Sequence, residues 1–402
     1  MKNVAILNIS DYGSTGKIAT GLYDYLKING YNSLLCCGRG EKNSPDKYII
    51  NSKYEIYYNI VVDRLFGDQG CHEYIATKRM LKLWDTLNID AIYLVNLHAN
   101  YINEEMVFKY AVKNDIPIVY IMADEYPFLG KCGYNKGCDN YKSGCGNCPQ
   151  KRDYPQSWFF DRSKKKYRIK EKYYPKLRAT FVAPKFVIEK AKTSPLMKGL
   201  SLVELDESIN VDKYRPYRDA QKYIGIPEDK IAIITIVPYN GKLDRKGGYY
   251  FQLLAKSLEN DDRYVFIHVG YRADTSDCPS NMRCIGFVSD QDELIRYYSA
   301  ADLFVFPSLE DTMPNTCLEA LSCGSPLLCF NISGMPYIAD NLCGTFVEPE
   351  SVEELKRVVL STHIKSKEII DYCRNYALKR YDSKEYFGKL IKIMSSLAHG
   401  NE

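Results

Sequence analysis

The stretch Ser308-Leu309-Glu310-Asp311-Thr312-Met313-Pro314-Asn315-Thr316-Cys317-Leu318-Glu319 decides the fold. It follows the apolar run Leu303–Phe306, which predicts a short buried strand. Pro314 suits the first turn of a helix, and we expect that helix to cover Asn315–Ser322. A strand, a polar loop and a helix in this order are typical of a βαβ unit. The backbone N–H groups at the start of such a helix suit a phosphate, and Pro314, Asn315 and Thr316 are therefore candidate binding residues.

Two carboxylates flank this helix start. Asp311 precedes the helix, and Glu319 lies within it, roughly one and a half turns from its start. Carboxylates beside a phosphate site are favourable only where they accept hydrogen bonds from hydroxyls, and sugars and ribose supply hydroxyls. The alternative is a capped surface helix that carries an incidental Glu.

The same alternation of strand and helix fills both halves of the chain. Strands are predicted at 4–9, 32–37, 91–96, 116–122 and 180–183, and then at 231–237, 264–269, 282–285, 303–306 and 327–330. Helices are predicted between them, for example at 16–29, 104–113, 248–258 and 291–300. This pattern indicates the α/β class, with two Rossmann-like, doubly wound parallel-sheet domains.

The length of 402 residues also favours two domains. We predict an N-terminal domain at 1–207, a C-terminal domain at 208–382 and a terminal helix at 383–402. Sheets of this type bind ligands outside the carboxyl ends of their strands, so two facing domains would form a binding cleft.

Composition narrows the function classes. The hydrophobic fraction of 46% and the charged fraction of 26% are those of a soluble globular protein. No apolar run is long enough to span a membrane, and the N-terminus does not resemble a signal peptide, so we expect a cytoplasmic protein. The net charge of +4 does not indicate nucleic-acid binding.

Two loops could approach an anionic ligand. Arg245 and Lys246 follow the strand 231–237 and could clamp a diphosphate, although a solvated basic loop would have the same composition. The loop 11–17 joins the first strand to the first helix, and Gly16 would let a ligand come close to the backbone. This loop lacks the Walker A pattern, and an ordinary tight turn is the alternative.

Together these segments resemble the retaining glycosyltransferases of family four, which have the GT-B fold. The likeness is strongest to capsular and colanic-acid-type enzymes. It is carried by Gly13–Lys17, by Arg245-Lys246-Gly247, by 307–312 and by 318–324. It implies metal-independent transfer, with retention, from a UDP- or GDP-sugar to a glycan or a polyprenyl-diphosphate-linked acceptor in capsule, exopolysaccharide or O-antigen biosynthesis. It also implies that the last helix crosses back to the first domain.

The resemblance assigns roles to single residues. Lys246 and Arg245 would hold the diphosphate, Asp311 would contact the donor sugar, and Glu319 would bind the ribose. The backbone of Asn315 and Thr316 would meet the phosphate, and Gly16 would make room for the donor. The backbone at Gly286, Phe287 and Val288 would flank the base.

Two departures from the family pattern affect these roles. Relatives carry a His-Asp pair where this chain has Ala123-Asp124, so Asp124 is the remaining catalytic candidate there. A later loop has Tyr337 in place of Glu. These differences leave a second hypothesis, a catalytically degenerate subunit that binds sugar or nucleotide. A third is an enzyme of the same fold that cleaves or epimerises nucleotide sugars.

Four of the fourteen cysteines cluster in seventeen residues: Cys132, Cys138, Cys145 and Cys148. Their number, and the Cys-x2-Cys spacing of the last pair, suit a structural zinc site, and disulfides or free thiols are the alternatives. The resembling enzymes carry the same cysteines. Scattered cysteines such as Cys36, Cys37, Cys317, Cys323, Cys329 and Cys373 are predicted to be small core residues.

The remaining candidates are a histidine and a basic segment. His98 follows the strand 91–96 and would lie on the acceptor side, or it would be a hydrogen-bonded core residue. The segment 162–178 has nine basic residues and one acidic residue. It would contact the inner face of the plasma membrane peripherally, or it would be a solvated basic face. The other four histidines carry no such context.

Overall fold

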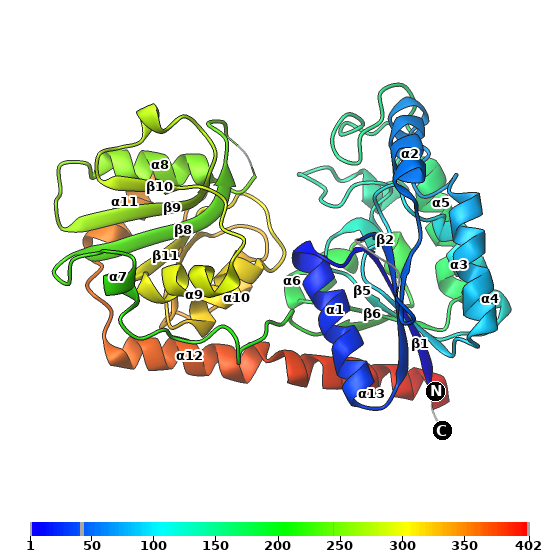
Figure 1. Cartoon of the computed structure of the whole chain (residues 1–402). Coiled ribbons are helices and arrows are strands. Elements are labelled where there is room, and N and C mark those ends of the chain that lie inside the picture. Colours follow the sequence, from blue (N-terminus) through cyan, green and yellow to red (C-terminus); the bar gives the residue numbers. More distant parts are fainter. Residues whose placement is uncertain (1, 41–43, 244, 400–402) are drawn as a thin grey trace. The chain divides into compact units, whose positions relative to one another are not determined.

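A computed structural model describes residues 2–40, 44–243 and 245–399 of the chain. It divides into two compact units, Met1–Leu205 with Lys384–Glu402, and Asp206–Ser383 (Figure 1). Asp244 of the basic loop and the last three residues of the predicted terminal helix lie outside the described residues. No described helix has the length and apolar character that crossing a membrane requires.

The first unit is built on a seven-stranded sheet in the order β3-β2-β1-β4-β5-β6-β7, with every neighbouring pair parallel. The central strands β4 and β5 are apolar along their whole length, as expected for a parallel sheet that helices cover on both faces. The strands are β1 (Asn3–Ser10), β2 (Asn32–Arg39), β3 (Lys47–Ile49), β4 (Ala91–Leu94), β5 (Ile118–Ile121), β6 (Ala179–Ala183) and β7 (Ser201–Glu204). The helices are α1 (Gly13–Ile28), α2 (Lys53–Phe66), α3 (Tyr74–Thr86), α4 (Glu104–Lys113), α5 (Ser163–Tyr173), α6 (Lys185–Ala191) and α13 (Ser383–His399).

The second unit has a six-stranded parallel sheet in the order β10-β9-β8-β11-β12-β13. Its strands are β8 (Ile231–Tyr239), β9 (Tyr264–Tyr271), β10 (Met282–Ile285), β11 (Leu303–Phe306), β12 (Leu327–Phe330) and β13 (Gly344–Val347). Its helices are α7 (Ala220–Tyr223), α8 (Gly248–Ser257), α9 (Gln291–Ala300), α10 (Asn315–Ser322), α11 (Val352–Leu360) and α12 (Lys367–Tyr381). In both sheets the order reverses beside the first strand, which marks the ligand-binding edge of a doubly wound sheet.

The two parallel sheets confirm the predicted fold class. The helices α2, α3, α7 and α12 and the edge strands β3, β7 and β13 were not predicted from the sequence. Helix α2 buries only Asn59 and Asp63, so it lacks the apolar stripe that periodicity detects. Strand β7 has no fully buried residue, since it lies at the edge of its sheet.

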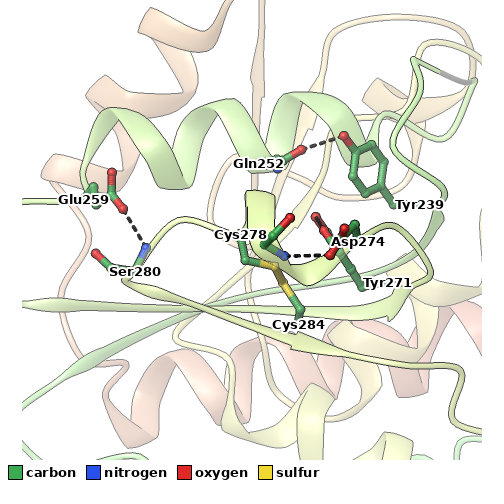
Figure 2. The surroundings of a disulfide bond; sticks show 9 residues. Tyr239, Gln252, Glu259, Tyr271, Asp274, Cys278, Ser280 and Cys284 are labelled. Atoms are coloured by element: carbon green, nitrogen blue, oxygen red, sulfur yellow. Dashed lines mark hydrogen bonds between the residues drawn. A yellow bond between two sulfur atoms is a disulfide. The ribbon is translucent and has the colours of Figure 1, made fainter.

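The six scattered cysteines are buried and unpaired, as predicted for core residues. A disulfide that the sequence analysis did not foresee joins Cys278 to Cys284 (Figure 2). It connects the segment before β10 to β10 itself, beneath α8, and both cysteines pack against the apolar core of that face. This bond ties an edge strand to its own preceding loop.

The basic segment is not simply a solvated face, which corrects one of the two interpretations made from the sequence. Lys166 and Lys170 of α5 point into the first unit and are fully buried. The Lys170 Nζ donates to the carbonyls of Tyr126 and Leu129 at 2.6 and 2.9 Å. Burial lowers the pKa of Lys170 to about 8. Part of the positive charge therefore serves the interior of the domain.

One buried histidine predicts that the stability of the second unit depends on pH. His268 in β9 is fully buried, and its Nε2 lies 3.1 Å from the Val237 carbonyl. Burial lowers the pKa of His268 from 6.5 to about 4. The unfolded chain therefore binds a proton below pH 6.5 that the folded chain excludes until about pH 4, so the free energy of unfolding should fall as the pH falls through this window. We expect a loss of about 2–3 kcal/mol between pH 6.5 and 4.5.

Denaturant unfolding of the wild type and of His268→Gln at both pH values measures this effect. The variant should lose less stability over the same interval, and equal losses in the two proteins would contradict the assignment.

Candidate active site

Two loops of the second unit meet at the carboxyl ends of neighbouring strands. The loop after β8 carries Arg245 and Lys246, and the loop after β11 carries Asp311. The Lys246 Nζ lies 2.5 Å from the Asp311 carboxylate, and the nearest guanidinium nitrogen of Arg245 lies 3.6 Å from the same oxygen. The Asp311 side chain is only 8% exposed, whereas about a third of each cation remains exposed. The structure thus brings together three of the four residues predicted to be catalytic.

Hydrogen bonds and close backbone packing hold these two loops together. The Arg245 carbonyl accepts hydrogen bonds from the Leu309 N–H and the Ser308 hydroxyl, both at 2.9 Å. Gly247 comes next, with φ of +74°, and a Cβ built on it would lie 1.7 Å from the Pro307 carbonyl oxygen. Only glycine fits this position, because both the left-handed backbone and the carbonyl exclude a side chain.

The start of α10 lacks the usual capping contacts. Pro314 is the N-cap residue, and no side chain caps the helix. The side-chain oxygens of Asn315 and Thr316 are buried, and neither has a hydrogen-bond partner among the described residues. Buried polar atoms without partners are rare in native proteins and call for an unseen partner. A bound phosphate would accept from the Thr316 hydroxyl and would also benefit from the helix dipole. The Asn315 oxygen accepts only, so it needs a donor such as a sugar hydroxyl.

Glu319, the residue predicted to bind the ribose, is buried. It is only 3% exposed, and its carboxylate accepts a hydrogen bond of 2.7 Å from the Tyr298 hydroxyl. Burial and this carboxylate hold the pKa of Tyr298 well above its usual value. The ribose role of Glu319 therefore stays a prediction, and it requires the carboxylate to gain access to ligand.

The predicted base-binding segment follows β10. Phe287 is 72% exposed, and the Arg272 guanidinium lies 5.6 Å from the centre of its ring. The Gly286 carbonyl accepts from the Gly270 N–H at 3.1 Å, which ties this segment to the end of β9. Val288 is half-buried and packs against the apolar core cluster that includes Val269 and Ile295. An exposed ring and a cation at the ends of two adjacent strands offer a stacking surface for an aromatic base.

In the first unit, the structure pairs two residues that the sequence analysis treated separately. The His98 Nε2 lies 2.6 Å from a carboxylate oxygen of Asp124. The other oxygen of Asp124 accepts from the Tyr126 N–H at 2.9 Å, and the Tyr154 hydroxyl lies 3.4 Å from the His98 Nδ1. His98 follows β4 and Asp124 follows β5, so adjacent strands bring the pair together. Only the proximity of two strand ends in the fold could have revealed it.

Gly16 lies in the first turns of α1 and is buried. A Cβ at this position would lie 2.7 Å from the carbonyl carbon of Asp11. The close packing of helix on loop therefore requires glycine by itself, and the predicted donor contact stays a prediction.

The four clustered cysteines line one cavity in the first unit, together with Lys131 and Gln150. Burial raises the pKa of Cys132 to about 12 and that of Cys145 to about 11. Among the described residues, no three of these sulfurs form a group within 4.8 Å of one another. They share a site, but they are not drawn into tetrahedral zinc geometry.

Comparison with known sequences finds a family that resembles part of the second unit. Residues 237–365 match the family described as "Glycosyl transferases group 1". The chain is 26% identical over 274 residues to the Escherichia coli K12 protein named as the colanic acid biosynthesis glycosyl transferase WcaC, over 64% of each chain. It is 31% identical over 122 residues to the E. coli O-antigen chain mannosyltransferase B, over 28% of this chain and 31% of that protein. The chain thus matches less than two thirds of the length of either relative.

Solved structures align with this chain over nearly its whole length. A glycosyltransferase from Rickettsia africae aligns over all of both chains, with a TM-score of 0.65 and 15% identity. Anabaena HepE in complex with UDP aligns over 98% of this chain and 100% of its own, with a TM-score of 0.65 and 12% identity. These neighbours and the two parallel sheets identify the fold as GT-B.

The loop contact at Gly247 can be tested with a matched glycine. Gly241 lies in the same loop with φ of +84°, but its nearest neighbour would lie 3.4 Å from an added Cβ. Gly241→Ala should destabilise the protein by about 1 kcal/mol through its backbone alone. Gly247→Ala adds a steric overlap and should cost about 3 kcal/mol. Denaturant unfolding measures both values, and equal losses would show that the contact with Pro307 does not constrain the loop.

Proposed function

We propose that the chain is a glycosyltransferase that uses a nucleotide-sugar donor. This proposal starts from the match of residues 237–365 to the family described as "Glycosyl transferases group 1". The donor is a UDP- or GDP-sugar, and the acceptor is a glycan or a polyprenyl-diphosphate-linked sugar of a surface polysaccharide. One observation carries this proposal. A cation pair, Lys246 and Arg245, converges on a buried carboxylate in the same unit as an uncapped helix start with unpartnered polar side chains.

The donor would occupy the carboxyl edge of the second sheet. Its phosphates would accept hydrogen bonds from the backbone N–H groups of Asn315 and Thr316 and from the Thr316 hydroxyl, and its base would stack on Phe287. Lys246 and Arg245 would bind the diphosphate. UDP in complex with Anabaena HepE, a neighbour of the same fold, supports a nucleoside diphosphate as the ligand of this edge.

The cation pair would also supply the catalytic effect. Without donor, Asp311 neutralises Lys246 at 2.5 Å. When a diphosphate binds, its oxygens would compete for the ammonium, and the carboxylate would accept hydrogen bonds from the sugar hydroxyls. Charge then builds on the diphosphate as the glycosidic bond breaks, and two fixed cations stabilise that charge more than they stabilise the ground state. We propose retention of the anomeric configuration, with a donor phosphate oxygen taking the proton of the acceptor, and no catalytic metal.

The acceptor would meet the first unit at His98 and Asp124. This chain has Ala123 where the resemblance to family four implies a His before Asp124. The imidazole of His98 lies 2.6 Å from the Asp124 carboxylate and places a hydrogen-bonding ring beside it from the neighbouring strand. We infer that this pair orients an acceptor hydroxyl, with Asp124 fixing the ring of His98.

Contact with a membrane would suit a lipid-linked acceptor. Helix α2 presents Tyr54, Tyr57, Tyr58 and Val61, spaced three and four residues apart, and each is more than half exposed. Tyrosine suits the interface of a bilayer, and exposed basic residues of α5 such as Lys164 and Arg168 would add attraction to anionic lipid. We propose a cytoplasmic protein that binds the inner face of the plasma membrane peripherally. The four clustered cysteines would hold a structural zinc ion if their sulfurs drew together.

A catalytically degenerate subunit is the second candidate, and Ala123 is the residue that favours it. Such a subunit would bind nucleotide but would not turn over. Measuring binding and turnover on the same protein separates the two functions.

The first experiment compares Lys246→Met with Lys242→Met, because Lys242 is an exposed cation in the same loop. Calorimetric titration with UDP and GDP, alone and as sugar conjugates, should give micromolar binding of one nucleotide to the wild type and to Lys242→Met. Lys246→Met should bind that nucleotide at least tenfold more weakly and should lower kcat about 10²–10³-fold, since one stabilising donor to the leaving group is lost.

Each other outcome has a definite meaning. Folded wild-type protein that binds no nucleotide would overturn the proposed donor site. Binding without turnover over a broad acceptor screen would favour the degenerate subunit. Equal effects of the two substitutions would reduce the basic loop to a general electrostatic role.

The His98–Asp124 pair predicts a different kinetic signature. His98→Phe should keep donor binding unchanged and lower kcat/KM for the acceptor about 10²-fold, because the oriented hydrogen bond is lost while an aromatic ring still fills the space. Asp124→Asn should lower the same parameter by a similar factor, and the double variant should add little. Additive losses in the double variant would show that the two side chains do not act together.

A further inference from the structure

A group of metal-ligating side chains in the first unit belongs to neither the donor site nor the cysteine cluster. Asp63 near the end of α2, His72 in the following loop and Glu73 at the N-cap of α3 each offer one ligand atom, and these atoms lie within 4.8 Å of one another. Asp63 and Glu73 are 2% and 4% exposed. No role was predicted for His72, because Asp63 lies nine residues earlier in the chain and only Glu73 is adjacent.

The distances around the His72 Nδ1 resemble a ligand shell. The backbone carbonyl of Asp68 lies at 3.2 Å, one oxygen of Asp63 at 3.3 Å and one oxygen of Glu73 at 3.8 Å. Ligand atoms about 2.1 Å from a common cation are separated by about 3.0 Å in octahedral and about 3.4 Å in tetrahedral geometry. Three oxygens around one nitrogen at these separations therefore leave a place where one cation could touch all four atoms after small shifts.

The hydrogen bonds of the cluster leave one ligand atom unsatisfied. The Asp63 oxygen that faces His72 is buried and has no hydrogen-bond partner among the described residues, and its second oxygen accepts from the Asn100 amide. Glu73 is oriented by the N–H groups of Gly70 and His72. A single N–H on His72 could serve only one of three oxygens, whereas a cation could satisfy them all. Neutral groups thus fix both carboxylates, as in the outer shell of a metal site.

We propose that Asp63, His72, Glu73 and the Asp68 carbonyl bind one divalent cation. An imidazole with two carboxylates and a carbonyl suits manganese or zinc better than magnesium or calcium, which prefer oxygen alone. The cation would join the end of α2 to the start of α3 and would be structural, since four protein ligands surround it. Lys166 is buried nearby and keeps the local charge from being strongly negative. The competing arrangement is a protonated His72 between the two carboxylates, without metal.

Manganese is the first probe, because thiolates bind it poorly and the cysteine cluster will not compete. Full-length protein is stripped with a chelator and titrated with Mn²⁺, and free Mn²⁺ is followed by electron paramagnetic resonance. We expect one Mn²⁺ per chain, and a melting temperature that rises with Mn²⁺ concentration. His72→Gln should weaken binding at least 100-fold, and Cys145→Ser with Cys148→Ser should leave it unchanged.

Asn100→Gly removes the amide that orients Asp63 and accepts the φ of +56° at this position, and it should weaken binding about 10-fold. It also keeps the test decisive if the ligand variants fold poorly. Wild-type protein that takes up no Mn²⁺ or Zn²⁺ at the cluster, or His72→Gln protein that binds Mn²⁺ as the wild type does, would overturn the site in favour of the protonated cluster. Neither result depends on glycosyl transfer.

Discussion

The Asp311 residue joins three loops at the carboxyl ends of strands in the second unit, where the candidate active site lies. Its carboxylate lies 2.5 Å from the Lys246 ammonium and accepts from the Thr312 N–H at 2.9 Å. Its backbone carbonyl accepts from the Gly334 N–H at 3.0 Å. One residue therefore joins the loops after β8, β11 and β12. Without the ammonium, this buried carboxylate would keep only the Arg245 guanidinium at 3.6 Å, so the arrangement of the loops depends on the charge pair.

The close approach of these loops depends in turn on two glycines, which have no side chain. A Cβ at Gly247 would lie 1.7 Å from the Pro307 carbonyl oxygen, and one at Gly334 would lie 1.6 Å from that of Thr312. Both glycines contact the segment that carries Asp311. The backbone can come this near only where no side chain intervenes, and the space gained places Lys246 on the carboxylate rather than in solvent. The Arg-Lys-Gly order in the sequence thus has a steric reason beside its electrostatic one.

The buried strands, and the loop residues that follow directly after them, could be predicted from the local sequence pattern. The apolar runs that became β1, β8, β9 and β11 are buried on both faces, so their length and composition were sufficient. Lys246, Arg245 and Asp311 could be found because the strand before each loop was clear. Helix α2 was not predicted because its exposed face is apolar and its buried residues are Asn59 and Asp63. This is the reverse of the usual amphipathic pattern, in which apolar residues are buried and polar residues are exposed.

What the sequence could not supply is contact between segments far apart in the chain. His98 and Asp124 were both named from their positions after strands, but their pairing depends on the adjacency of β4 and β5. The Asp63, His72 and Glu73 cluster depends on how the loop 67–72 folds back between two helices that were not predicted. Polar side chains become informative when burial removes their water, because each must then find a partner in the protein or in a ligand. The unpartnered oxygens of Asp63 and Thr316 meet this criterion at two separate places. The carboxylate oxygen is the physical reason to propose a cation at the first, and the hydroxyl, which can donate to a phosphate, is the reason to propose the donor at the second.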